Sequence, residues 1–214
     1  MDIREQIAGR VALELHDGDV VNLGIGLPTK VVNYLPEGIN ISLQMECGMM
    51  GAGLSPEPED TDPDIITAGA EPASVLPGGS FFDSAMSFAI MRGGHVDVTV
   101  LGAFQVDQQG NIASWVVPGR RLMGMGGSMD LVVGAKRVIV AMEHTTKDGQ
   151  PRILKQCALP LTAQGQINLI VTERAVIEVT PAGLLLREIL QGWTLEEVVQ
   201  STEAPLLYQN ETLS

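Results

Sequence analysis

The sequence predicts an α/β fold of three layers, in which helices cover both faces of a mostly parallel central sheet. Short, mainly apolar runs alternate with helical patterns along the chain, and such runs are typical of strands buried on both faces. The chain has 24 Gly and only 4% aromatic residues, which suits aliphatic strands joined by tight turns. With 45% hydrophobic residues over 214 positions, it is long enough to bury a full core.

The first elements follow from the spacing of apolar residues. At the N-terminus these recur every fourth position, at Ile3, Ile7, Val11 and Leu15. This period predicts an amphipathic helix, which ends at the turn 17–19. An apolar strand is expected at 20–23. Pro28 then opens a short helix, because proline is favoured at the first helical position. A second strand, at 39–43, leads towards Glu46.

The rest of the chain continues this alternation. The acidic, Pro-rich stretch 55–64 is interpreted as a solvated loop. The same signals predict a helix at 82–90, a turn at 107–111, a short helix after 124–127, and strands at 96–101, 112–117, 138–142, 169–171 and 176–179. The capping box at 194–197 starts the last helix. We predict one domain, residues 1–202, followed by a flexible tail, 203–214.

Composition excludes several classes of function. The net charge of −13 and the pI of about 4.5 repel phosphate backbones and anionic lipids, so we expect no nucleic-acid partner and no membrane. The two cysteines make no disulfide framework, and no apolar run is long enough to span a bilayer. With no secretory signal at the N-terminus, the expected location is cytoplasmic. The three histidines lack metal-ligand spacing, which predicts no metal site.

Glu46 is the first candidate for chemistry. It follows an apolar strand and lies among Met45, Cys47 and Met49 in a Gly-rich turn. A carboxylate rarely has such apolar neighbours without a task or a cationic partner, although a solvent-facing loop glutamate is the structural alternative. A carboxylate in a dry turn can act as a nucleophile towards an acyl group. It would then need backbone N–H donors for the oxyanion, which the glycines at 126–127 before a helix could supply.

Two other features compete with this interpretation. Cys47 is intrinsically the better nucleophile, but it needs a lowered pKa and usually a base, and no histidine is near it in the sequence. Gly24-Ile25-Gly26 after a strand resembles half of a dinucleotide fingerprint. Thr29 stands where the third glycine would be, so that signal is weak.

A series of ordered motifs resembles the β subunits of family I coenzyme A (CoA) transferases. They are VNLGIGLPT (21–29), Glu46-x-Gly48, FDS (82–84), RGGHVD (92–97), LGAFQVD (101–107), GMGGSMDLV (124–132), VAMEH (140–144) and PLTA (160–163). The match extends to about residue 202. The strongest likeness is to acetate/acetoacetate and butyrate–acetoacetate CoA-transferases.

This resemblance implies a fold, a mechanism and a partner. The fold would be of the NagB/RpiA/CoA-transferase type. Glu46 would attack an acyl-CoA and then carry CoA as a glutamyl thioester, with short-chain acids and 3-oxoacids as expected substrates. A backbone N–H of Gly126 or Gly127 would line the oxyanion hole. An α subunit would complete the enzyme, as a heterodimer or an α2β2 assembly, with no permanently bound cofactor because CoA is a substrate.

The resemblance also implies which residues bind CoA. Contacts would come from the opening motif, through Asn22, Gly24 and Gly26, and from Gly124. For the CoA phosphates the sequence offers Lys30, Arg120 and Arg121, although surface charge explains these residues equally well.

Three departures from the family pattern leave alternatives open. Met45 and Cys47 stand where the family has Ser and Asn around the glutamate. Ala70 stands where many succinyl-CoA:3-oxoacid members have Lys, which argues against a dicarboxylate substrate. Because Met45 and Cys47 alter the surroundings of Glu46, a hydrolase that uses Glu46 to activate water stays an alternative. A non-catalytic CoA-binding subunit is the other.

Overall fold

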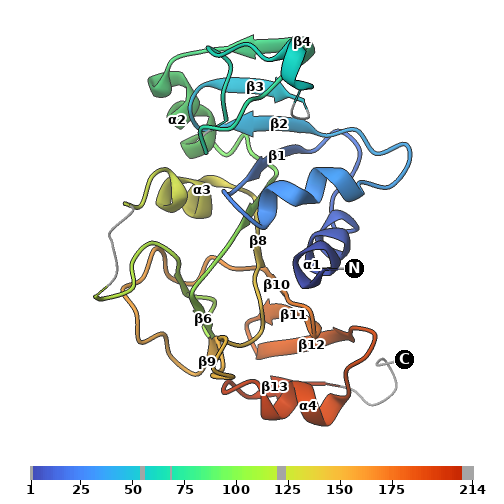
Figure 1. Cartoon of the computed structure of the whole chain (residues 1–214). Coiled ribbons are helices and arrows are strands. Elements are labelled where there is room, and N and C mark those ends of the chain that lie inside the picture. The colour runs from blue at the N-terminus through green and yellow to red at the C-terminus, as the bar shows by residue number, and fades with distance from the viewer. Residues whose placement is uncertain (1, 54–55, 68, 120–123, 209–214) are drawn as a thin grey trace.

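The computed structural model describes residues 2–53, 56–67, 69–119 and 124–208. Within them one sheet runs the length of the molecule in the order β13-β12-β11-β10-β8-β5-β1-β2-β3-β4 (Figure 1). Its strands are β1 (Val20–Leu23), β2 (Ser42–Met45), β3 (Met49–Ala52), β4 (Val75–Phe81), β5 (Val98–Leu101), β8 (Arg137–Ala141), β10 (Leu169–Val171), β11 (Ala175–Thr180), β12 (Gly183–Ile189) and β13 (Leu206–Leu207). The central strands β10, β8, β5, β1 and β2 pair in parallel.

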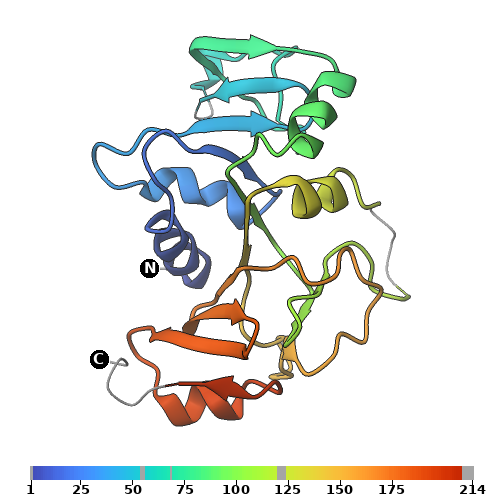
Figure 2. The ribbon, with the colours of Figure 1, turned by 180° about the vertical axis from the view of Figure 1, so that it is seen from behind.

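Helices cover both faces of this sheet. They are α1 (Ile3–Ala12), α2 (Ser84–Arg92), α3 (Ser128–Gly134) and α4 (Leu195–Gln200), with the 3₁₀ helices η1 (Pro28–Tyr34) and η2 (Pro58–Asp60). Alternate residues of β8 enter two separate cores: Val138 and Val140 pack on the side of α2 and α3, Ile139 and Ala141 on the side of α1. Figures 1 and 2 show α1 and α3 on opposite sides of β8. This arrangement confirms the predicted α/β class.

A small second sheet lies beside the large one. Its strands are β6 (Gln105–Asp107), β7 (Ile112–Ala113) and β9 (Ile153–Leu154), in the order β7-β6-β9. Only the first two residues of the strand expected at 112–117 pair in it. The next residue, Ser114, instead donates its N–H to the side-chain oxygen of Thr162 at 3.0 Å.

Several strands differ from their predicted bounds. The strand expected at 39–43 is displaced to β2, so that it ends directly before Glu46. β4 was not predicted. It contains Pro77-Gly78-Gly79, which is typical of a turn, but as the edge strand of the sheet it tolerates proline. The segment predicted as a flexible tail contains β13, which pairs with β12. Its first residues are therefore held by the sheet, and 209–214 lie outside the described residues.

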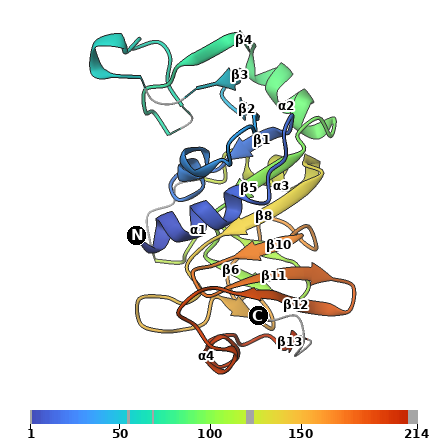
Figure 3. The ribbon, with the colours of Figure 1, turned by 90° about the vertical axis from the view of Figure 1, so that its right-hand side faces the viewer.

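The packing of α2 against α3 brings distant segments of the chain together. A Cβ at Gly134 would overlap the carbonyl oxygen of Met91, so only glycine allows this approach. Arg92 Nε donates to Asp130 Oδ1 at 2.6 Å, which joins the two helices at the surface. Figure 3 shows both helices on one side of the sheet, near β1. The loop before α3 is thereby placed next to the turn that carries Glu46.

Neither cysteine is paired, and no helix among the described residues is long and apolar enough to cross a membrane.

Candidate functional site

Glu46 lies on a tight turn between β2 and β3. Gly48 N–H donates to the carbonyl oxygen of Met45 at 3.0 Å, which closes the turn around Glu46 and Cys47. Gly48 has a φ of +117°, and a Cβ there would overlap the carbonyl oxygen of Phe82. Phe82 N–H in turn donates to the carbonyl oxygen of Gly48 at 2.9 Å. The turn therefore needs glycine at this position and is attached to the strand leading into α2.

The loop before α3 meets the Glu46 carboxylate. A Cβ at Gly126 would lie 3.4 Å from Glu46 Oε1, and one at Gly127 would overlap Oε2 and lie 3.1 Å from Cδ. The backbone of both glycines is therefore directly beside the carboxylate. The two segments that sequence reasoning selected separately, the Glu46 turn and the glycines at 126–127, thus lie together.

The backbone amides at this contact are available for chemistry. Among the described residues, neither Gly126 nor Gly127 N–H donates a hydrogen bond to another protein atom, and the Glu46 side chain has no hydrogen-bond or ion-pair partner. Gly127 is the N-cap of α3, where the first N–H groups of a helix lack internal acceptors. The half-buried carboxylate is therefore unpaired and next to free donors, which is suitable geometry for holding a developing oxyanion.

The site lies at the carboxyl ends of parallel strands, where α/β folds usually bind ligands. The loop 24–26 follows β1, and Glu46 follows β2. Gly26 has open space around its Cβ position, whereas Gly24 packs against Leu101 and Val100 of β5. Gly24 therefore has a packing reason to be glycine. A contact of Gly24 or Gly26 with CoA stays a prediction.

Two residues further along the chain, Ile66 and Gly69, contact these two segments. Cys47 Sγ donates weakly to the carbonyl oxygen of Ile66 at 3.9 Å. Gly69 lies beside Ile25, whose side chain is 68% exposed. Ala70, at the next position, has a φ of +60°, which is strained for a residue with a Cβ. Ala70 is exposed and follows Gly69, which lies beside Ile25.

Asn22 lies behind the site instead of on its rim. Its side chain is only 4% exposed, and Nδ2 donates to both the carbonyl oxygen and Oε1 of Gln44. Sequence reasoning missed Gln44 and Ser87, which bond to each other below Glu46. A glutamine inside a short apolar strand was the available signal. A direct contact of Asn22 with CoA stays a prediction.

Cys47 is a poor nucleophile in this environment. Although Cys47 is exposed, partial desolvation raises the pKa of its thiol, and the neighbouring Glu46 charge also raises it, against a smaller lowering by a backbone hydrogen bond. The thiolate, which is the reactive form, is therefore disfavoured near neutral pH. This favours Glu46 over Cys47.

The other predicted CoA contacts are Gly124 and, for the phosphates, Lys30, Arg120 and Arg121. Lys30 is half-buried on η1, and within the described residues it forms no ion pair. Gly124 has a φ of +87° and open space around its Cβ position. Arg120 and Arg121 lie outside the described residues.

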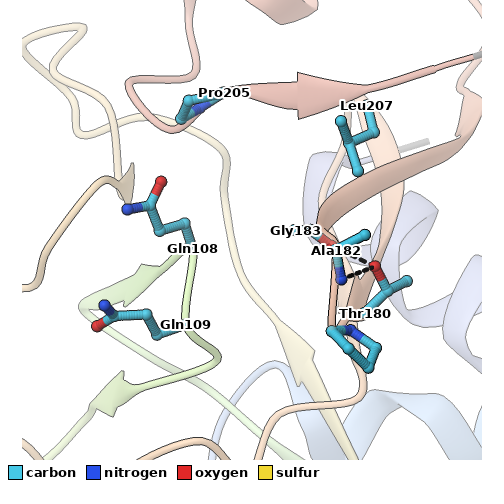
Figure 4. Close-up of a pocket in the computed structure, with 8 residues that line it drawn as sticks. Gln108, Gln109, Thr180, Ala182, Gly183, Pro205 and Leu207 are labelled. Carbon is cyan, nitrogen blue, oxygen red and sulfur yellow. Dashed lines mark hydrogen bonds between the residues drawn. The ribbon is translucent and has the colours of Figure 1, made fainter.

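A cavity of about 500 Å³ lies near the other end of the sheet. Gln108 and Gln109 face the β11–β12 turn and Leu207 across it (Figure 4). Among the described residues that line it, none is a predicted site residue and none has an ionisable side chain, so these residues offer no acid, base or carboxylate nucleophile.

Comparison with known sequences gives consistent matches. The family described as coenzyme A transferase matches residues 4–201. An acetate CoA-transferase subunit beta of Escherichia coli (strain K12) is 55% identical over 205 residues, which covers 95% of this chain and 93% of the relative. A mitochondrial succinyl-CoA:3-ketoacid coenzyme A transferase 2A of Rattus norvegicus is 48% identical over 201 residues. That match covers 93% of this chain but 39% of the relative.

A solved structure shows the same fold. The acyl-CoA transferase YdiF of Escherichia coli O157:H7, without ligand, superposes with a TM-score of 0.78 at 24% identity. The match covers 99% of this chain and 43% of that one.

Proposed function

The chain belongs to the coenzyme A transferase family and is the β subunit of such an enzyme, and we propose that its Glu46 carries CoA from an acyl-CoA to a second carboxylic acid. The contact between the Glu46 carboxylate and the backbone of Gly126 and Gly127 carries this proposal. It supports a nucleophile and an oxyanion site within reach of one carbonyl carbon.

The proposed reaction proceeds in two half-reactions. A carboxylate oxygen of Glu46 attacks the thioester carbonyl, the C–S bond breaks, and an acyl-glutamyl anhydride and the CoA thiolate form. The thiolate then attacks the glutamyl carbonyl, and the bond to the acyl oxygen breaks. This leaves a glutamyl-CoA thioester and the first free carboxylate. A second carboxylate takes CoA by the reverse sequence, so the kinetics are ping-pong.

We propose short-chain monocarboxylates and 3-oxoacids as the exchanging acids. The E. coli relative is named for acetate, and this supports a small acid. By the family resemblance, Ala70 stands where many succinyl-CoA:3-oxoacid members have lysine. The absence of that cation disfavours a second carboxylate on the substrate. The replacement of Asn by Cys47 makes the rim less polar, which is compatible with an acid that has one charged end.

The proposed partner is a CoA-transferase α subunit. The relatives named subunit beta indicate that a second subunit exists, and the rat enzyme has more than half its length outside the matching region. Exposed apolar side chains surround the site, with Ile25 at 68%, Ile66 at 45% and Met129 at 48%. Burying them against a partner would also exclude water from the thioester.

The test is mass spectrometry of the α–β complex after incubation with acetoacetyl-CoA or butyryl-CoA, without an acceptor acid. We expect a CoA-sized adduct on the peptide that contains Glu46. It should be discharged by acetate and be absent in Glu46→Gln, which keeps the size of the side chain but removes the nucleophile.

Other results would refute this function. An acyl group on Cys47 would show that Cys47, and not Glu46, is the nucleophile. Steady loss of thioester with no adduct and no acid would indicate a hydrolase. No turnover with either thioester would contradict the proposed substrate class.

A further inference from the structure

Three polar side chains lie buried behind Glu46, on three different elements. Asn22 of β1 is 4% exposed, Gln44 of β2 is 1% exposed and Ser87 of α2 is fully buried. Asn22 and Gln44 lie on adjacent parallel strands, one residue beyond the register pair Val21–Leu43. Burying such groups is costly unless each is hydrogen-bonded, so their partners decide what the cluster does.

The hydrogen bonds of this triplet run in one consistent direction. Asn22 Nδ2 donates to the carbonyl oxygen of Gln44 at 2.9 Å and to its Oε1 at 2.7 Å. Gln44 Nε2 donates to Ser87 Oγ at 2.9 Å, and Ser87 Oγ donates to the carbonyl oxygen of Met45 at 3.4 Å. The side chain of Gln44 is thus the link between the other two.

These bonds end on the backbone that carries Glu46. The carbonyl groups of Gln44 and Met45, the two residues before it, each accept a side-chain hydrogen bond. On the other side of the turn, Gly48 is attached to Phe82 by backbone contacts. The turn is therefore held at both ends, by the buried triplet on one side and by the backbone on the other.

A purely structural role would not require these residue types. Thr99 of β5 is the register partner of Asn22 and is fully buried, yet its hydroxyl has no hydrogen-bond partner among the described residues. The fold therefore tolerates a buried hydroxyl without a hydrogen bond next to Asn22. In the triplet, by contrast, both Oε1 and Nε2 of Gln44 are hydrogen-bonded. A buried hydrogen-bond network whose polar groups all have partners contributes more to fixing one side-chain arrangement than to the free energy of unfolding.

We propose that Gln44 is a positioning residue, which through Asn22 and Ser87 fixes the direction of the Glu46 turn so that the carboxylate faces Gly126 and Gly127. This inference rests on the proposed function and adds to it a supporting residue that never touches the substrate. Misplacement of a reacting group by about 1 Å can cost roughly 10²-fold in rate. The effect should therefore fall on the chemical step.

The test compares Gln44→Met with Thr99→Val in the α–β complex. Methionine keeps the length and volume of glutamine but removes both hydrogen bonds, and Thr99→Val is the matched loss of a buried polar group outside the triplet. We expect Gln44→Met to slow CoA-adduct formation at saturating acyl-CoA by roughly 10- to 100-fold, with KM changed less than about 3-fold. Ser87→Ala should act in the same direction, and Thr99→Val should match wild type.

The outcomes separate the two proposals. Absence of the adduct in wild type would refute both. An adduct in wild type together with unimpaired Gln44→Met would refute only the positioning role, as would a loss that appears in KM alone. Thermal unfolding of each complex gives its folded fraction, and a rate loss that disappears after correction for that fraction would also overturn the inference.

Discussion

Gly127→Ala should disable the site without disturbing the fold. Gly127 has φ −83° and ψ 3°, which alanine can adopt, so the substitution meets no backbone strain. The added methyl would lie 3.6 Å from Phe88 Cζ, an ordinary contact, but would overlap Glu46 Oε2. To restore ordinary contact at 3.4 Å, that oxygen must move by about 1 Å. Because Oε2 is the end of a flexible side chain, Glu46 will rotate and the helices will stay in place.

The displacement sets the size of the effect. A shift of about 1 Å in a reacting group costs roughly 10²-fold in rate, or about 2.7 kcal/mol in the barrier. Replacing an N-cap glycine by alanine costs only about 1 kcal/mol of stability. Activity should therefore fall much further than the folded fraction does.

The assay is the single-turnover rate of CoA-adduct formation in the α–β complex, with thermal unfolding of the same samples. Gly9→Ala is the control: it lies in α1 on the opposite face, and its methyl would meet only Tyr34, at 3.7 Å. We expect control and wild type to react at the same rate. If Gly127→Ala does so too, the carboxylate does not react from the position seen beside α3.

Three further predictions concern single residues. Cys47→Ser should form the CoA adduct at a rate within about 2-fold of wild type, because the raised pKa of the Cys47 thiol disfavours a thiolate nucleophile. Loss of the adduct in this variant would show that Cys47 takes part in the reaction. Ala70→Lys should lower KM for a dicarboxylate acceptor such as succinate by about 10-fold through one charge-assisted hydrogen bond. The control is Ala70→Met, and equal KM values for the two variants would contradict a substrate contact at position 70. Burial lowers the pKa of His144 to about 3, so the unfolded chain binds a proton below about pH 6.5 that the folded chain does not. Stability should thus fall by about 2 kcal/mol from pH 7 to pH 5, and urea unfolding of His144→Gln should lack this decrease.

Many elements follow from local sequence signals. The strands β1 and β10 have the bounds that their apolar runs predict. The last helix begins after Thr194, where the capping box is present in the structure. The helix opened by Pro28 is also present, as η1. These signals concern neighbouring residues, so a single sequence is enough to read them.

Other elements depend on partners far along the chain. β4 contains a Pro-Gly-Gly segment typical of a turn, and it is a strand only because β3 pairs with it at the sheet edge. β12 and β13 likewise depend on β11 and on each other. Strand propensity reflects the neighbours that a strand acquires, which the local sequence does not contain.

The same division applies to the site. Local sequence signals were enough to identify Glu46 as an unusual carboxylate, and glycines 126–127 as free donors before a helix. Only the tertiary structure brought them into contact, because that contact depends on the order of β1, β2 and β5 and on the packing of α2 against α3. It also placed Asn22 in a buried triplet with Gln44 and Ser87. Side-chain partners across strands are set by register and burial, which are properties of the folded chain.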